Sequence, residues 1–301
     1  MLPNIQSYSS LPEFVQSRLI QDLEAIHTEV SGVIENNDIE YVHRIRIAIR
    51  RYRNNLKIFR YFADQSFHDF LSLKYQETFE FSSLLAFARD LDIQAYLIEE
   101  GLQLPHTAIQ TDFLQTIKDE RNNVQNQLVN YFNTSSYTLL INHADELNTI
   151  FSNKDFQFLN EKNIFNAICS SFAYALSILY PITESSDGEE VHSFRKAIRR
   201  VRYTLETFQP IIAYPIEEII EESHLIQDLL GDMHDLDMLN HSLLNNGLMQ
   251  KTQSKEILEN INNKHHLYQL QFVEKLQSKE IIDFLFLQLE HFSKEQTTIW
   301  M

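Results

Sequence analysis

Glycine and proline are scarce in this sequence of 301 residues, which contains 5 glycines and 6 prolines. Because these residues interrupt helices and supply the turns of β architectures, their scarcity favours long helices. A single cysteine, Cys169, excludes an internal disulfide framework and is typical of a reducing compartment. Hydrophobic residues make up 44% of the chain, which is enough for a packed core. The composition therefore predicts an all-α protein.

Segments that direct a chain to a membrane are also missing. Residues 1–5 have neither the basic nor the apolar region of a signal peptide, and no run of residues approaches 18 apolar positions. We therefore expect a cytoplasmic protein that makes no membrane contact.

The sequence lacks the common catalytic motifs. There is no glycine-rich phosphate loop, no Gly-x-Ser-x-Gly elbow and no His-Glu-x-x-His pair. A spacing of histidines and carboxylates that would hold a metal does not recur in the chain. We therefore expect no enzymatic activity, no metal site and no cofactor.

Positive charge is scarce overall but concentrated in two segments. The net charge is -17, from 25 lysines and arginines against 42 acids. Residues 41–60 hold seven cations and no acid, and residues 191–208 hold five cations and the single acid Glu206. The acidic remainder should repel duplex nucleic acid and anionic membranes, whereas the two segments indicate a local anion site.

These two segments are copies of one pattern. Val42-His43-x-x-Arg46-x-Ala48-Ile49-Arg50-Arg51-x-Arg53 recurs 149 residues later as Val191-His192-x-x-Arg195-x-Ala197-Ile198-Arg199-Arg200-x-Arg202. On a helix the apolar residues of each copy share one face and are expected in the core. His43, Arg46, Arg50, Arg53, Lys57 and Arg60 form a stripe beside that face, as do His192, Arg195, Arg199 and Arg202.

A solvated helix face is the simplest interpretation of a charge run. Three features favour a binding site instead: the stripe contains one sign of charge, arginine outnumbers lysine six to one in the first copy, and the stripe occurs twice. Like charges one turn apart destabilise a helix, so an unmixed stripe needs an opposite charge nearby. Arginine suits bidentate contact with phosphate.

The helical periodicity predicts two consecutive four-helix units, residues 1–152 and 156–301, with a basic helix second in each. The expected helices are 11–35, 40–63, 66–100, 110–150, 160–180, 190–209, 215–245 and 251–296, with an interruption of the fourth near residues 133–136. The third helices share an Asp-Leu-Asp sequence.

Acidic residues of the third helices are candidates for orienting the arginines. In each pair, Asp90 with Asp92 and Asp235 with Asp237, only one carboxylate can face the basic helix, and the other is expected in solvent. Lys118 and Arg121 are candidates for adding to the site, and His265 and His266 are expected to be solvated.

The doubled His-led basic motif and the Arg89–Ile93 and Gly231–Met238 segments resemble the CHAD domain, the conserved histidine α-helical domain. The resemblance implies two four-helix bundles related by a pseudo-two-fold axis, with the basic helices lining a central groove that binds inorganic polyphosphate. Proteins associated with polyphosphate are then candidate partners. Carried over by position, the ligand contacts are His43, Arg46, Arg50, Arg51, Arg53, Lys57, His192, Arg195, Arg199, Arg200 and Arg202.

Departures from exact repetition lie at the end of the second copy. Glu206 stands where Lys57 stands in the first copy, and Gln209 stands where Arg60 stands, so the second half should bind phosphate more weakly there. Ala86 replaces Gly231, which is expected to alter the helix approach in the first half.

The resulting expectation is non-catalytic binding of inorganic polyphosphate. Two alternatives stay open: a metal-dependent enzyme that processes polyphosphate, and a scaffold that binds RNA or an acidic protein segment. RNA ranks below polyphosphate, because the aromatic residues of the basic helices lie mostly at core positions. Nucleic acid is therefore not the expected partner.

Overall fold

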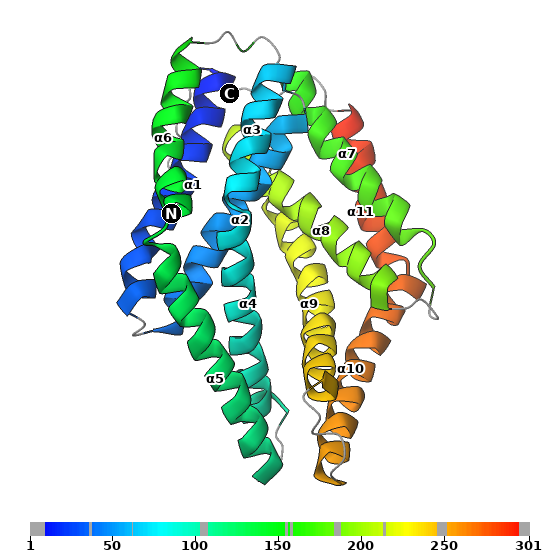
Figure 1. Ribbon diagram of the computed structural model, residues 1–301. Coiled ribbons are helices and arrows are strands. Elements are labelled where there is room, and N and C mark those ends of the chain that lie inside the picture. Colours follow the sequence, from blue (N-terminus) through cyan, green and yellow to red (C-terminus); the bar gives the residue numbers. More distant parts are fainter. Residues whose placement is uncertain are drawn as a thin grey trace.

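The computed structural model describes residues 10–35, 38–61, 63–102, 108–153, 156, 159–183, 188–212, 215–245 and 252–294. Every regular element in these ranges is a helix, which confirms the predicted all-α class (Figure 1). None of the helices described in these ranges is long and apolar enough to span a membrane.

The helices of the first half of the chain are α1 to α6, with a π-helical turn after α4. Those of the second half are α7 to α11, with a short 3₁₀ turn after α8. In order they are α1 (Leu11–Glu35), α2 (Ile39–Tyr61), α3 (Gln65–Glu77), α4 (Phe79–Tyr96), η1 (Leu97–Gly101), α5 (Ala108–Tyr131), α6 (Ser135–Asn153), α7 (Glu161–Leu179), α8 (Gly188–Phe208), η2 (Gln209–Ile211), α9 (Glu217–Asn245), α10 (Thr252–Gln277) and α11 (Glu280–Lys294).

The basic segments form α2 and α8 as predicted, but two long predicted helices are broken. The predicted helix 66–100 changes direction at Thr78, which ends α3 and begins α4 with φ -90° and ψ 0°. The predicted helix 251–296 breaks at Lys279, whose φ is 62°, a left-handed conformation that no helix continues through. The interruption expected near residues 133–136 lies between α5 and α6.

The helices of the two halves pack in the same order. In the first half α2 packs against α1 and α4, α4 against α5, and α6 against α1. In the second half α8 packs against α7 and α9, α9 against α10, and α11 against α7. The halves meet where α2 contacts α8 and α4 contacts α9. This order is compatible with the predicted pair of bundles, and the boundaries at residues 152 and 156 remain a prediction.

The apolar faces of α2 and α8 form the centre of the core, as the helical pattern predicts. Their aliphatic and aromatic side chains are fully or almost fully buried, and a buried side chain of this size contributes about 1.5–3 kcal/mol relative to exposure. The set comprises Ile45, Ala48, Ile49, Tyr52, Leu56 and Phe59 on α2, and Phe194, Ala197, Ile198, Val201, Leu205 and Phe208 on α8.

Contacts across the two halves fix how α2 and α8 cross. The ring of Phe208 lies 6.2 Å from that of Phe59 and 6.2 Å from that of Phe14 on α1. Below these rings the Thr207 hydroxyl donates to the amide oxygen of Asn55, whose own amide donates to Asp22. These buried polar and apolar contacts at the crossing fix the position of the basic stripe of α2 relative to that of α8.

The replacement of Gly231 by Ala86 in the first half does not require a different helix approach. A Cβ atom added at Gly231 would lie 3.8 Å from the guanidinium of Arg195, an ordinary van der Waals contact. Alanine would thus fit at position 231 as well, and an altered helix approach in the first half stays a prediction.

Candidate functional site

A cavity of about 860 Å³ lies over α2 and α8. In Figure 1, α3 and α4 lie on one side of α8 and α7 lies on the other, and all three contribute to its walls. We call this space the basic cavity. Its lining residues are Arg46, Arg50, Arg53, Asn54, Lys57, Ile58, Arg60, Tyr61, His68, Tyr75, Ser82, Ala86, Ala167, Tyr174, Lys196, Arg199, Arg200, Tyr203 and Thr204.

The charge of this lining has one sign. Eight of the described lining residues are lysine or arginine, five from α2 and three from α8, and none of the described lining residues is aspartate or glutamate. The protein as a whole carries a net charge of -17, so the basic cavity is a positive region in an acidic molecule. An arrangement of this kind concentrates field lines and attracts anions.

Burial and neighbouring cations oppose the charges of Arg50 and Arg199 in the basic cavity. Burial first, and then the neighbouring cations, lower the pKa of Arg50 to about 9. Burial and the charges of Arg195 and Arg46 likewise lower the pKa of Arg199. Arg50 therefore remains cationic at neutral pH. The Nε atoms of Arg46 and Arg50 are buried without a hydrogen-bond partner, so these groups are underused as donors.

Aromatic rings support several of the cations. The guanidinium of Arg53 lies 3.9 Å from the centroid of the Tyr75 ring, and the Lys57 ammonium lies 4.9 Å from it. Burial alone would raise the pKa of Tyr75, but the hydrogen bond with Lys57 and the charge of Arg53 lower it overall. Arg50 lies 5.3 Å from the ring of Tyr203. Cation–π contacts of this kind hold cations in place without neutralising them.

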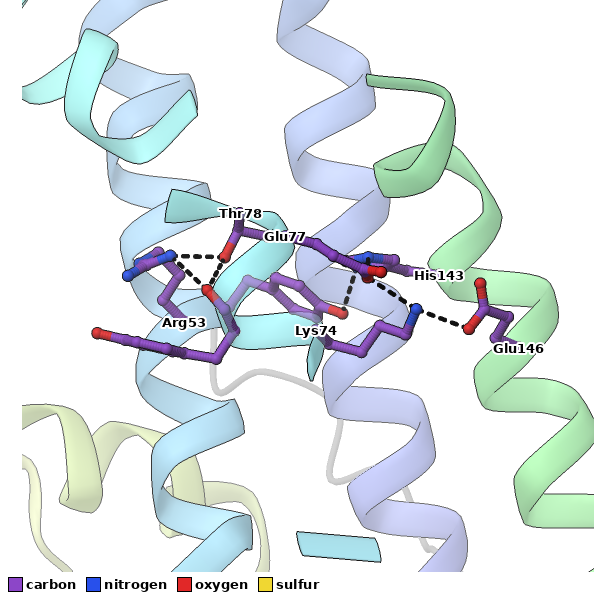
Figure 2. A network of polar contacts seen from close by, with 8 residues as sticks. Arg53, Lys74, Glu77, Thr78, His143 and Glu146 are labelled. Atoms are coloured by element: carbon purple, nitrogen blue, oxygen red, sulfur yellow. Dashed lines mark hydrogen bonds and ion pairs between the residues drawn. The ribbon is translucent and has the colours of Figure 1, made fainter. Parts of the chain in front are cut away.

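The break between α3 and α4 fixes the position of Arg53. One guanidinium nitrogen donates to the carbonyl of Tyr75 at 2.8 Å and to the hydroxyl of Thr78 at 2.7 Å (Figure 2). Both acceptors are neutral, so Arg53 keeps its full charge for a ligand. At the end of α3, the carbonyl of Tyr75 is thus available to accept from a side chain.

Behind this break, a buried polar network ties α3 to α6. The Lys74 ammonium, 1% exposed, pairs with Glu77 at 2.8 Å and with Glu146 at 2.6 Å (Figure 2). His143 lies 2.8 Å from Glu77 through Nε2 and 3.0 Å from the Tyr52 hydroxyl through Nδ1. Burial, followed by the charge of Lys74, lowers the pKa of His143 to about 4, so the imidazole is neutral.

Six of the eleven residues implied by the family resemblance line the basic cavity: Arg46, Arg50, Arg53, Lys57, Arg199 and Arg200. The other five do not line it: His43, Arg51, His192, Arg195 and Arg202.

Two of the three arginines among those five residues are paired with acids. Arg51 forms an ion pair with Asp22 of α1, whose side chain is 1% exposed. Arg202 lies 3.3 Å from Glu206, the acid that replaces Lys57 in the second copy. Both side chains are therefore engaged with the protein itself.

The two histidines of the repeat lie away from the basic cavity. Burial first, and then nearby cations, Arg89 for His43 and Lys196 for His192, lower the pKa of both imidazoles. The His192 ring stacks on that of His234, with centroids 4.6 Å apart. Within the described residues no group of three or more histidines, cysteines or carboxylates could hold a metal ion.

One aspartate of each Asp-Leu-Asp pair faces the basic helices. Burial raises the pKa of Asp90, and the charges of Arg46 and Arg195 oppose this rise. Burial also raises the pKa of Asp235, to about 6, against the charge of Arg195. These carboxylates lie beneath the crossing of α2 and α8 and outside the lining of the basic cavity.

The second aspartates bind other helices. Asp92 pairs with Arg121 at 2.8 Å and is 6% exposed, so its expected solvent exposure was wrong. Asp237 lies 3.2 Å from His265, so the imidazole of His265 contacts a carboxylate as well as solvent. Arg121 and Lys118, which pairs with Glu99, do not line the basic cavity and so do not add to it.

Several lining residues were not among the predicted contacts. Arg60 lies on the predicted stripe, and Lys196 adjoins Arg195 in the repeated motif, so the sequence held a signal for both. The tyrosines had no such signal, because Tyr75 comes from α3 and Tyr174 from α7. Only the packing of these helices against the basic pair brings their rings to the site.

Comparison with known proteins identifies the fold. The chain is similar to the "CHAD domain from the plant Ricinus communis", with a TM-score of 0.66 and 20% identity over 92% of each chain. It is also similar to "PptA from Streptomyces chartreusis", with a TM-score of 0.57 and 12% identity over 93% of this chain and 99% of the other. No curated protein matches the sequence. The family model of the CHAD domain matches residues 17–244, so the chain belongs to the CHAD domain family.

Proposed function

We propose that this CHAD domain protein binds linear inorganic polyphosphate in the basic cavity. The observation that carries the proposal is the lining itself, in which eight cations occur and no described carboxylate does. The buried and unpartnered Nε atoms of Arg46 and Arg50 add to it, because a bound phosphate would supply the missing acceptors.

The arrangement of the cations suits a chain better than a single ion. From Arg46 to Arg60 the stripe on α2 extends about 21 Å along the helix axis. Arg199, Arg200 and Lys196 present a second row from α8 along the same cavity. A linear polyanion can contact both rows at once and release the counterions of each.

Binding without catalysis is part of the proposal. The described lining consists of cations, tyrosines, neutral side chains and the imidazole of His68, which lies 3.3 Å from Asp69. The rival function, metal-dependent processing of polyphosphate, is tested by incubating the protein with polyphosphate and Mg²⁺ or Mn²⁺. If phosphate is released faster with the protein than without it, the protein is an enzyme that processes polyphosphate, and the proposal of binding without catalysis is wrong.

A scaffold for RNA or an acidic segment is the second rival. The tyrosines of α3 and α7 bring more aromatic surface to the basic cavity than the basic helices alone provide. A competition experiment separates the ligands: polyphosphate should displace a labelled single-stranded RNA at concentrations at which the RNA does not displace polyphosphate.

We place the proposed binding in the cytoplasm, since Cys169 is a free thiol.

Salt dependence tests the proposed mechanism. If about six phosphates are engaged, the logarithm of the association constant should fall with the logarithm of the salt concentration at a slope of about -4, taking the value for single strands. Fluorescence titrations with labelled polyphosphate between about 50 and 200 mM salt measure this slope. An affinity that is independent of salt would show that contacts other than ion pairs hold the ligand.

A further inference from the structure

The tyrosines that line the basic cavity fall into two classes. Tyr75 and Tyr203 are the less accessible pair: Tyr75 is partly buried with Arg53 3.9 Å from its ring, and Tyr203 is buried with Arg202 4.7 Å from its ring. Tyr61 and Tyr174 are open, at 60% and 43% exposure. The open pair forms an accessible aromatic surface inside a cationic site.

The two open rings belong to one continuous wall. The Tyr61 hydroxyl, at the end of α2, lies 3.3 Å from the hydroxyl of Ser170 on α7. Ala167, Ser170 and Tyr174 follow one another at spacings of three and four residues, so they share a face of α7. We call the surface made by Tyr61, Ala167 and Tyr174 the tyrosine shelf.

An inorganic phosphate chain has no group that gains from an aromatic face, whereas a nucleobase does. Bases stack on tyrosine rings and on arginine guanidinium planes. Arg200 lies 5.4 Å from the ring of Tyr174, so the shelf has a guanidinium beside it. The Nδ2 donor of Asn54, which also lines the basic cavity, is buried without a partner and could serve an acceptor of the ligand.

We propose that the basic cavity also takes nucleoside polyphosphates, with the base on the tyrosine shelf and the phosphates on the arginines of α2 and α8. The inference rests on the proposed function, since the phosphates use the same cations. A volume of about 860 Å³ accommodates a base together with several phosphates.

The experiment compares two ligands with equal numbers of phosphates. Adenosine 5′-tetraphosphate and inorganic tetraphosphate are titrated into the full chain by calorimetry at one salt concentration. Since the nucleotide carries no greater charge, electrostatics alone gives it no advantage. We expect it to bind about tenfold more tightly, as one stacked base contributes. Equal affinities would overturn the inference.

Variants assign the advantage to the shelf. Tyr61→Ala and Tyr174→Ala should each lower the ratio of the nucleotide affinity to the inorganic tetraphosphate affinity towards one, whatever each does to the binding of phosphate itself. Tyr61→Phe retains the ring and should retain the preference. Tyr180→Ala is the matched control, since Tyr180 is 87% exposed and lies outside the cavity.

The outcomes separate this inference from the proposed function. A preference that survives in both alanine variants overturns the tyrosine shelf but not polyphosphate binding. Inorganic tetraphosphate and longer polyphosphate both failing to bind would overturn the proposed function and this inference together. Because both rings are exposed, the variants are expected to fold, and their circular dichroism spectra verify this.

Discussion

At the scale of single residues, the arginines of the repeat form two groups: those paired with an acid of the protein and those that are not. Burial lowers the pKa of both Arg50 and Arg199, and so do nearby cations: Arg199 and Arg46 act on Arg50, and Arg195 and Arg46 act on Arg199. Arg51, next to Arg50 in the sequence, points instead to Asp22 on α1. The first pair is available to a ligand, whereas Arg51 serves the structure.

Replacing Arg51 by alanine should therefore reduce stability and leave binding intact. Burial raises the pKa of Asp22, and Arg51 is the largest of the charges that oppose this rise. Losing that partner leaves a buried carboxylate with the amide of Asn55 as a remaining donor. We expect Arg51→Ala to lower the free energy of unfolding by about 1–3 kcal/mol, measured by urea denaturation.

Arg44→Ala is the matched control for that variant. Arg44 also pairs with an acid, Glu29, but on the surface of the protein. Its removal should leave stability unchanged within experimental error. If Arg51→Ala instead weakened polyphosphate binding more than severalfold at unchanged stability, then Arg51 would be a ligand contact as the family resemblance implies.

The sequence predicts which residues share the basic stripe but not which of them are neutralised. Helical spacing places Arg46, Arg50, Arg53 and Lys57 on one face, and all four line the cavity. The partner of Arg51 lies 29 positions away on another helix, so no local pattern announces it. The partner of Arg202, in contrast, is Glu206 one turn later, and helical spacing alone predicts such a pair.

At the scale of elements, α3 is the helix that the sequence did not separate. Residues 66–100 read as one helix, because no glycine or proline interrupts the segment. Tertiary contacts surround the break at Thr78. Arg53 donates to the carbonyl of Tyr75 and the hydroxyl of Thr78, and Lys74 pairs with Glu146 of α6. Tyr75, near the end of α3, lines the basic cavity.

Acidification should weaken this anchor through His143. Its folded pKa is lowered to about 4, mainly by burial and also by Lys74, while Glu77 and Glu146 oppose the shift. The unfolded chain takes up a proton near pH 6.5. The contribution of His143 is thus complete above about pH 6.5 and is lost as the pH falls towards 4. Between pH 7 and pH 5 the loss should be about 1–2 kcal/mol.

The variant His143→Gln isolates this effect, because other groups titrate in the same range. The raised pKa of Asp235, about 6, acts in the opposite direction and strengthens the folded state as the pH falls. Urea denaturation at pH 7 and pH 5 should show a smaller loss of stability in His143→Gln than in the unaltered protein. His266→Gln, at an exposed position of α10, is the control. Equal losses in all three proteins would mean that His143 plays no part.

At the scale of the whole molecule, the two halves share one core. Phe208 of α8 is fully buried against Phe14 and Phe59 of the first half. A hydrogen-bonded chain from Thr207 through Asn55 to Asp22 crosses the same boundary. Neither half can keep these groups satisfied alone, so the basic cavity and the core that supports it depend on both.

We therefore expect the chain to unfold in a single cooperative transition. Scanning calorimetry should give one peak, and Phe208→Ala should destabilise the protein by about 3–5 kcal/mol while preserving that peak. Phe286→Ala, which removes a 57% exposed ring from α11, should change stability by no more than about 0.5 kcal/mol. Two separate transitions would mean that the halves fold independently.

The all-α class and the two basic helices were predictable from the sequence, because periodicity and low glycine content act locally. The crossing of α2 with α8 was implied only by the family resemblance, since charge repulsion alone would separate the two stripes. The crossing is held by buried residues such as Phe208, whose partners lie in the other half of the chain. The aromatic wall from α7 depends on the same long-range packing.

The central claim is that cations of both halves hold one polyanion in the basic cavity, and charge reversal tests it most directly. Calorimetric titration with polyphosphate is carried out on the unaltered protein, on Arg50→Glu/Arg199→Glu, and on Lys118→Glu/Lys294→Glu. The last pair makes the same change in net charge at exposed positions outside the cavity.

The cavity double variant should lose detectable binding while remaining folded, and the surface double variant should bind within a few-fold of the unaltered protein. Equal weakening by both pairs, or retained binding after reversal of Arg50 and Arg199, would contradict the account.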